Sequence, residues 1–489
     1  GPESYAIIYK REGKDPDEQK IAAPKITPIV TNRDSQSEFL SEIQTSQVQP
    51  IEPVFVDYKK DMSQFEAQPG IDVLYKKNET NDIFTLIYVF NTGTENDPAL
   101  NLAFNYLSYL GTDKMTAEEI ASEMYDIACS FYMNAGANQS SIQITGLSEN
   151  MGKAMEIVEG LIAGAKPDEA ILENLKGDML KSRADAKLNQ SRCFGALQRY
   201  LFYGGDFIRR TTLTDPALQA LTSEQLLAKI GGLMGKQHEV LYYGPQKETE
   251  IKSALAEHHK VAADLQPLEK KFSALLPTDA NKVVLAQYDA KQLYYLQFSN
   301  RGEKFDVAAD PEITLYNEYF GGGMNTIVFQ EMREARGLAY SAWATLATPS
   351  NANGDYSYYA FIATQNDKMQ KAVEAFDDII NNMPESEKAF GIAKEALVSR
   401  LRTERTVKDG VLWSYLRARD LGLDAPRDKQ IFEKVQSMTL DDVKAAQQKW
   451  VKGRKYVYGI LGDIQDLDLN YLKTLGPIQT VSQEEIFGY

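Results

Sequence analysis

The chain has 489 residues, 43% of them apolar and 10% aromatic, which is enough apolar material for several buried cores and excludes global disorder. Its 53 lysines and arginines against 69 aspartates and glutamates give a formal net charge of −16. A field of this sign repels a phosphate backbone, so nucleic acid is excluded as an expected partner. The longest apolar stretches, such as residues 83–90, fall far short of the roughly 18–20 residues of a membrane-spanning helix, so we expect a soluble chain.

The two cysteines and three histidines do not form a pattern typical of a disulfide framework or a metal site. Cys129 and Cys193 have no CxxC spacing, and we expect both to be small core residues. His258 and His259 are consecutive, so on a helix their side chains point about 100° apart and cannot chelate a metal as an i, i+4 pair would. We expect them to be surface imidazoles on a charged helix. The third histidine is His238.

Internal repetition determines the expected architecture. The string MGKAMEIVEGLI from Met151 matches MQKAVEAFDDII from Met369, an offset of 218 residues. The string LTSEQLLAKIGGLMGKQHEVLYYG from Leu221 matches MTLDDVKAAQQKWVKGRKYVYGILG from Met438, an offset of 217. Two nearly equal offsets indicate one duplicated domain of a little over 200 residues.

We therefore predict two homologous domains, residues 51–267 and 268–489, and a preceding segment, residues 1–50, that belongs to neither copy. This segment is polar and proline-containing, which favours an extended linker. Its start, YAIIYKREGK from Tyr5, resembles the strand and glycine that close each copy, so we interpret it as the last strand of a preceding copy. A short β-arm packed on the chain's own surface is the alternative.

The first copy reads as an α+β unit. Thr116 and Glu119 form a capping-box pattern, apolar residues then recur at three- and four-residue steps, and Gly136 lies just past the expected helix end. Alternating and continuous apolar runs between turn residues predict strands. The predicted elements are strands at 71–78, 83–93, 139–148 and 238–244, and helices at 117–136 and 149–162.

The second copy repeats this pattern. Its predicted elements are strands at 282–290, 292–300, 340–347, 356–365 and 455–461, and helices that end near Tyr319, run through 328–337 and start at Asp367. Strands interrupted by pairs of helices indicate, for both copies, an antiparallel or mixed sheet with helices on one face.

The most specific string of the chain is YFGGGMNTIVFQEMREARGLAYSAWA, residues 319–344. Gly321, Gly322 and Gly323 lack the order of phosphate-binding or dinucleotide-binding loops. We interpret them as a helix C-cap, where glycine relieves left-handed backbone strain, followed by a tight connection.

Residue chemistry alone gives the end of this string an ordinary interpretation. Gly337 is expected to end the helix, which places Tyr340 at the start of a strand as a sheet residue. Arg333 is then a solvated arginine that pairs with Glu334 or Glu331.

The glycine-rich helix end followed by R-E-x-R-G-L-A-Y-S resembles the carboxyl-terminal half of the insulinase/pitrilysin family of zinc peptidases. The resemblance covers roughly residues 50–475. It implies a fold of the metallopeptidase and processing-peptidase type, in which four such domains form a chamber of two halves. It also implies that residues 15–50 are the hinge between halves, and it accounts for the isolated strand pattern at Tyr5.

The chain departs from the family at the zinc motif. The catalytic half of the family carries HxxEH on a helix, where two histidines bind zinc and the glutamate activates the metal-bound water. The counterpart here is NLAFNYLSYLGT, and the matching positions are Leu102, Asn105 and Tyr106. None of these can replace an imidazole ligand or a carboxylate base, so we expect no metal and no cofactor in this chain and zinc in a partner half.

In such halves the resemblance implies that Arg333 and Tyr340 reach across the closed chamber to the scissile carbonyl of the substrate. A guanidinium and a phenol hydroxyl are hydrogen-bond donors suited to a developing oxyanion. This site would exist only when both halves close.

The leading hypothesis is a non-catalytic half of a zinc metallopeptidase, inactive alone, whose partners are an HxxEH-bearing half or subunit and a peptide substrate. The alternative is an inert structural or peptide-binding scaffold of the same fold. The compartment stays open: large relatives suggest a bacterial envelope or periplasmic site, whereas two unpaired cysteines fit the cytoplasm equally well.

Overall fold

The computed structural model describes residues 4–9 and 37–489, and the chain divides into two compact units, Gly1–Ile51 and Glu52–Tyr489. Among the described residues of the first unit there is one helix, α1 (Glu38–Thr45), in which the Ser37 hydroxyl accepts a hydrogen bond from the Leu40 N–H at 3.1 Å. Residues 5–9 are exposed and adopt no strand. Most of the proposed hinge, and the remainder of the strand predicted from Tyr5, lie outside the described residues.

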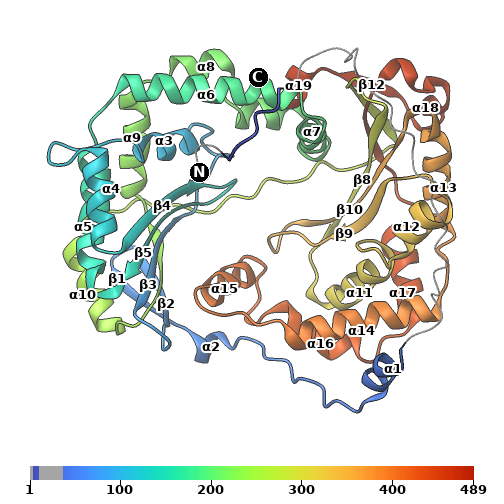
Figure 1. The fold of residues 1–489 in the computed structure, drawn as a ribbon, viewed down its shortest axis with the longest axis horizontal. Coiled ribbons are helices and arrows are strands. Elements are labelled where there is room, and N and C mark those ends of the chain that lie inside the picture. The colour runs from blue at the N-terminus through green and yellow to red at the C-terminus, as the bar shows by residue number, and fades with distance from the viewer. Residues whose placement is uncertain (1–3, 10–36) are drawn as a thin grey trace. The chain divides into compact units, whose positions relative to one another are not determined.

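The second unit contains two six-stranded sheets, one in each predicted repeat (Figure 1). The strands of the first sheet are β1 (Ser63–Gln68), β2 (Ile71–Lys77), β3 (Ile83–Phe90), β4 (Cys129–Ala135), β5 (Ser140–Leu147) and β6 (His238–Gly244). The strands of the second sheet are β7 (Lys282–Gln287), β8 (Gln292–Lys304), β9 (Ser341–Ala347), β10 (Asp355–Gln365), β11 (Val457–Gly462) and β12 (Ile478–Val481).

Five of the six strands follow one topology in both sheets, and the strand at one edge differs. Their strand orders are β1-β2-β6-β3-β5-β4 and β12-β7-β11-β8-β10-β9. β2 runs parallel to β6, and β7 runs parallel to β11 and β12, while the other pairs are antiparallel. Both sheets are therefore mixed, which confirms the predicted α+β class.

Helices cover one face of each sheet and build the two main cores. The first repeat has α2 (Tyr58–Asp61), α3 (Leu100–Leu107), α4 (Ala117–Asp126), α5 (Met151–Gly164), α6 (Glu169–Lys187), α7 (Gln190–Thr211), α8 (Asp215–Ala220), α9 (Ser223–Met234) and α10 (Glu248–His258). The second repeat has α11 (Asp310–Phe320), α12 (Ile327–Phe329), α13 (Met369–Asn381), α14 (Glu387–Thr403), α15 (Gly410–Asp420), α16 (Arg427–Val435), α17 (Leu440–Ala446), α18 (Leu469–Leu475) and α19 (Gln483–Phe487). Two π-helical turns span Gln330–Ala335 and Gln447–Val451, and short 3₁₀ turns span Ser148–Asn150, Val307–Ala309, Asn366–Lys368 and Ile464–Asp466. Across the described ranges, no helix has both the length and the apolar character needed to cross a bilayer.

The opposite face of each sheet is covered by a helix of the other repeat. Helix α7 lies against β8 and β11 of the second sheet, and α15 lies against β2 of the first (Figure 1). A Cβ atom on Gly459 of β11 would lie 2.3 Å from Leu201 Cδ1 of α7, so this glycine permits the close approach. We therefore call α7 and α15 the exchanged helices, and keep 51–267 and 268–489 as proposed domain limits.

The predicted helix over 117–136 is wrong in its second half. The capping box is present, because the Glu119 N–H donates to Thr116 Oγ1 at 3.2 Å and the Thr116 N–H donates to Glu119 Oε2 at 2.8 Å. The helix ends at Asp126, and Ala128 has a φ of +51°, which turns the chain back toward the sheet. The remaining residues form β4, an edge strand antiparallel to β5. Cross-strand pairing thus overrides the apolar periodicity that continued by coincidence through Phe131.

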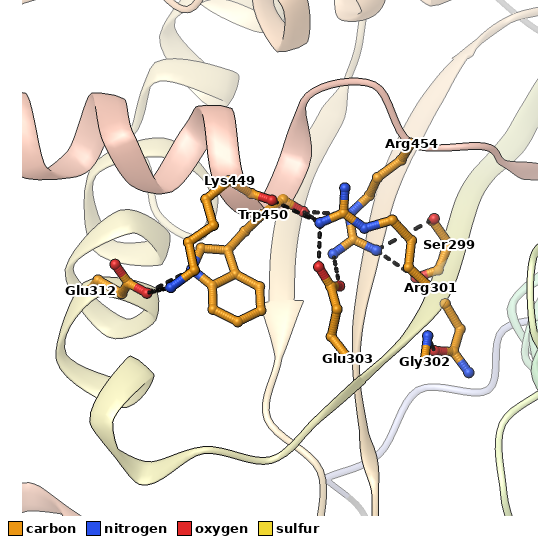
Figure 2. Close-up of polar contacts among 9 residues, drawn as sticks. Ser299, Arg301, Gly302, Glu303, Glu312, Lys449, Trp450 and Arg454 are labelled. Carbon is orange, nitrogen blue, oxygen red and sulfur yellow. Dashed lines mark hydrogen bonds and ion pairs between the residues drawn. The ribbon is translucent and has the colours of Figure 1, made fainter.

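A buried arginine cluster ties β8 to the end of α17 (Figure 2). The side chain of Arg454 is fully buried, and it donates to Glu303 Oε2 at 2.6 Å and to the Trp450 carbonyl. Arg301 donates to the Lys449 carbonyl at 2.8 Å. Trp450 Nε1 donates to Glu312 Oε1 of α11 at 2.8 Å. The two arginines satisfy carbonyls at the end of a π-helical turn, so the cluster has a structural role.

Candidate functional site

The three positions that the resemblance matches to the zinc motif, Leu102, Asn105 and Tyr106, lie on α3. Leu102 and Tyr106 are 2% and 0% exposed and belong to the core of the first repeat, whereas Asn105 is exposed. The Tyr106 hydroxyl donates to Ser223 Oγ at 2.7 Å and accepts the Asp168 N–H at 2.7 Å, so it joins α3 to α6 and α9. Tyr106, at the position that the resemblance matches to the second histidine, thus has a structural role. Within residues 4–9 and 37–489, no group of three His, Cys, Asp or Glu side chains is arranged to hold a metal ion.

The structure brings Arg333 and Tyr340 together. Arg333 lies in the π-helical turn after α12, and Gly337, at a φ of +59°, ends this turn. The Tyr340 N–H then donates to the Ala363 carbonyl at 2.9 Å and joins the residue to β10. The guanidinium carbon of Arg333 lies 5.4 Å from the centre of the Tyr340 ring and 5.0 Å from that of Phe329. A π-helical turn is a common way to redirect a side chain at a functional site.

Both side chains of this pair face solvent with their donors available. The Arg333 side chain is 44% exposed and Tyr340 is 71% exposed. The only ion pair of Arg333 with a described residue is a long one, 3.7 Å from Nε to Glu334 Oε1, while Glu331 pairs with Arg336 instead. A guanidinium and a phenol hydroxyl on one exposed surface can donate to an oxyanion that a second body brings to them.

The prediction that glycine relieves left-handed backbone strain at the end of α11 is wrong. Gly321 ends α11, and its N–H donates to the Asn317 carbonyl, but its φ of −114° is not left-handed. A Cβ atom at Gly321 would lie 1.9 Å from the Ala344 carbonyl oxygen of β9. The Ala344 N–H also donates to the Gly321 carbonyl at 2.9 Å. Glycine is therefore needed for close approach between α11 and β9, the strand that follows Tyr340.

The expectation of surface histidines is wrong for His259, which is 1% exposed. Its Nε2 lies 2.8 Å from Nε2 of buried His238, and its Nδ1 lies 2.5 Å from Glu159 Oε1. Nδ1 of His238 faces the Lys236 carbonyl at 2.8 Å, so it carries a proton and Nε2 is left as an acceptor. Burial and the neighbouring His259 lower the pKa of His238 to about 4. Neither residue spacing nor composition signals this pairing, because the rings come from β6 and from the end of α10.

The equivalent position of the second repeat is Asp377, which the 218-residue offset pairs with Glu159. Its nearest partner is an amide: Gln297 Nε2 donates to Asp377 Oδ1 at 3.4 Å. Burial raises the pKa of Asp377 to about 6. Each repeat thus holds a partly buried carboxyl under its sheet, and only the first provides it with an imidazole.

The two cysteines behave as predicted. Cys129 and Cys193 are 8% and 0% exposed, and burial raises the pKa of both thiols. They are core residues of β4 and α7.

Comparison with known proteins gives a consistent family. The peptidase M16 inactive domain matches residues 238–397. An uncharacterized zinc protease of Streptomyces coelicolor is 23% identical over 266 residues, which are 50% of this chain and 56% of that protein. The chain therefore spans little more than half the length of this relative.

Solved structures show the same fold. A peptidase M16 inactive domain from Pseudomonas fluorescens superposes with a TM-score of 0.64 at 18% identity, covering 82% of this chain and 98% of that one. The periplasmic protease PqqL from Escherichia coli superposes with a TM-score of 0.63 at 14% identity, covering 90% of this chain but 49% of that one.

Proposed function

We propose that this chain, which belongs to the insulinase/pitrilysin (M16) peptidases and contains their inactive domain, is the non-catalytic half of a zinc-dependent peptidase. The core-filling Leu102 and Tyr106 leave no metal ligands on α3, which supports a non-catalytic role. The match to 49% of a protease of about twice this length supports a half that works with another.

In this proposal the chain closes a chamber over an extended peptide and supplies Arg333 and Tyr340 to the scissile carbonyl. The observation that carries the assignment is the exposed pair itself, with the guanidinium 5.4 Å from the tyrosine ring centre. Their donors would stabilise negative charge that develops on the carbonyl oxygen as water attacks. Most ground-state affinity would come from pairing of the peptide backbone along a sheet edge in the other half.

The partner in this proposal is an HxxEH-bearing half, on the same polypeptide or as a separate subunit. That half would bind the zinc ion and activate the attacking water. This chain alone would bind no stoichiometric zinc and cleave no peptide. Metal analysis that finds one tightly bound zinc per purified chain would contradict the assignment.

The test is steady-state kinetics of the chain assembled with an HxxEH half on an unstructured peptide. Arg333→Ala and Tyr340→Phe should each lower kcat about 10²–10³-fold, because loss of one oxyanion donor typically has this effect. KM should change less. Matched controls are Arg336→Ala in the same turn and Tyr125→Phe, which is 82% exposed on α4.

Zinc content and thermal stability of each assembled variant show whether the zinc site and the fold are intact. If both site variants keep kcat/KM within about twofold of the parent, the pair has no catalytic role. If the assembled parent binds peptide and never cleaves it, the chain is an inert scaffold instead.

A further inference from the structure

The two sheets have four edge strands, and two of them carry features that hinder pairing with a further strand. Unpaired edges invite the addition of other strands, and proteins protect them with charges, bulges, short strands or a covering segment. Strand β1 contains the charged Glu66 and a bulge between Glu66 and Gln68, and β12 has only 4 residues. The remaining edges are β4 in the first sheet and β9 in the second (Figure 1).

Strand β9 is covered by α11 and the glycine that ends it. The Leu346 N–H donates to Asn317 Oδ1 at 2.8 Å, and Asn317 Nδ2 donates to the Leu346 carbonyl at 2.9 Å. The Ala344 N–H donates to the Gly321 carbonyl at 2.9 Å. The outward backbone groups in the second half of this strand are therefore already occupied.

Strand β4, at the equivalent edge of the first repeat, has none of these features. Its sequence CSFYMNA has no charged residue and no proline, and its register with β5 has no bulge over all 7 residues. The Leu147 N–H donates to the Ala128 carbonyl, and residues of an antiparallel pair alternate between facing the partner strand and facing away. The N–H and C=O groups of Phe131 and Met133 therefore point away from β5, and no residue in the described part of the chain bonds to them.

The side chains of β4 leave the same edge uncovered. On the helix-covered face, Phe131 and Met133 pack against the core of the first repeat but are only partly buried. On the opposite face, Ser130 is exposed and Tyr132 is 65% exposed. A further strand beside β4 would place every second side chain against the outer flank of Phe131 and Met133. The edge therefore fits an extended segment with apolar residues at alternate positions.

We propose that an extended peptide adds to the first sheet as a strand alongside β4, with alternate apolar side chains against Phe131 and Met133. In this mode of recognition, main-chain hydrogen bonds give the affinity and the alternate side chains give the specificity. Two chains with a formal net charge of −16 repel each other, which disfavours pairing of β4 with β4 of a second copy. The inference rests on the proposed function for the peptide as occupant, and it gives this half a peptide-binding edge of its own.

The first experiment measures binding of a labelled, end-blocked octapeptide of alternating valine and threonine to the full chain by fluorescence anisotropy. Two analogues carry N-methyl groups, one on every valine and the other on every threonine. In an antiparallel pair, a valine opposite Phe131 or Met133 directs its N–H toward β4, whereas the threonine N–H groups point away. N-methylation of the valines should therefore weaken binding about tenfold or more, and N-methylation of the threonines should leave it nearly unchanged. The reverse pattern would identify a parallel strand.

Amide hydrogen exchange and one variant then locate the peptide on the protein. Saturating peptide should slow exchange in residues 129–135 and leave residues 341–347 unchanged, because α11 already covers β9. Met133→Pro removes an outward N–H without breaking the ladder to β5, so it should weaken binding about tenfold. The matched control is Met133→Leu, which keeps the N–H and an apolar side chain and should bind as the parent does. The Tm of each variant shows whether it folds, and the two peptide analogues test the parent in either case.

Equal binding of the three peptides, or no binding at millimolar concentrations, would overturn the inference. A dimer in analytical ultracentrifugation without peptide, with residues 129–135 protected from exchange, would assign the edge to a second copy and overturn it as well. The assay needs no zinc-bearing half and does not involve Arg333 or Tyr340, so its failure leaves their proposed role standing. Failure of that role would leave the binding result standing.

Discussion

The two repeats have a carboxyl group at equivalent positions, but its hydrogen-bond partners differ between them. Glu159 Oε1 on α5 lies 2.5 Å from His259 Nδ1, and His259 Nε2 lies 2.8 Å from His238 Nε2, so two buried imidazoles lie in a row beside this carboxyl. Asp377 on α13 has only the Gln297 amide at 3.4 Å. A duplicated backbone can therefore keep a partly buried carboxyl while its surroundings diverge: one repeat gives it imidazole partners, and the other leaves it with an amide and a raised pKa.

This difference predicts opposite responses to pH. A carboxyl whose pKa is raised in the folded protein lowers the stability of the fold as pH rises, because the unfolded chain releases the proton first. For Asp377 this loss falls between the ordinary pKa of 3.8 and the folded pKa of about 6. An imidazole whose pKa is lowered in the folded protein lowers the stability of the fold as pH falls, because the unfolded chain takes up the proton first. For His238 this loss falls between the ordinary pKa of 6.5 and the folded pKa of about 4. In the parent protein the two effects partly cancel between about pH 4 and 6.

The largest expected effect comes from removing the carboxyl of the first repeat. Glu159→Ala should lower the free energy of unfolding by about 3–5 kcal/mol, because it leaves Nδ1 of buried His259 without its carboxylate partner. The matched change Asp377→Ala should cost less than half as much. Urea unfolding of both variants at pH 7 gives the comparison, and equal losses would show that the two carboxyls are energetically alike.

The exchanged helices should show that the repeats depend on each other equally. Leu197 of α7 and Leu412 of α15 are both 0% exposed, each packed with the other repeat's sheet. Leu197→Ala and Leu412→Ala should each cost about 2–5 kcal/mol. Both should shift a single unfolding transition, as followed by tryptophan fluorescence and circular dichroism together. Two separate transitions would mean that the sheets unfold independently.

The acid response of the first repeat can be isolated with Asp377→Asn as the background. In this variant the free energy of unfolding should fall by about 2–3 kcal/mol as pH drops from about 6.5 to 4. Over this range His238 binds a proton in the unfolded chain but not in the folded protein. Adding His238→Gln should remove this slope. Chemical unfolding at several pH values measures it, and a flat profile with His238 present would show that the ring is already protonated in the folded state.

The smallest effect is a gain. Asp377→Asn should raise the free energy of unfolding at pH 7 by about 1–2 kcal/mol, because the amide keeps an acceptor for Gln297 without a buried charge. Below about pH 4 the gain should vanish, since Asp377 is then neutral in both states. A loss at pH 7 would mean that the ionised carboxylate has a favourable partner.

Much of the fold follows from local patterns. Strands such as β2, β3 and β10 have alternating or continuous apolar residues, and α5 and α13 have helical periodicity within a repeat that the sequence itself shows twice. Strand β4 was missed because its partner β5 decides its conformation. The same holds for α7 and α15, since an amphipathic pattern predicts a helix but not which sheet it covers.

The candidate site was only partly accessible from sequence. The string around Arg333 and Tyr340 was identified by resemblance, and the structure places the two residues in contact distance. The pairing of His259 was not predictable, because it depends on groups brought together from distant segments. The sequence predicted a left-handed cap at Gly321. The close approach of Gly321 to β9 could not be predicted, because it leaves no local signal in the sequence.

The exchange of α7 and α15 has a consequence for how the chain could be divided. The connector from 267 to 280 has no helix or strand, so a split of the gene there would separate the repeats without cutting a helix or a strand. Each fragment would then carry a helix that belongs on the other's sheet and a sheet face that is bare without it. The fragments would therefore behave as an obligate heterodimer, soluble together and prone to aggregate apart.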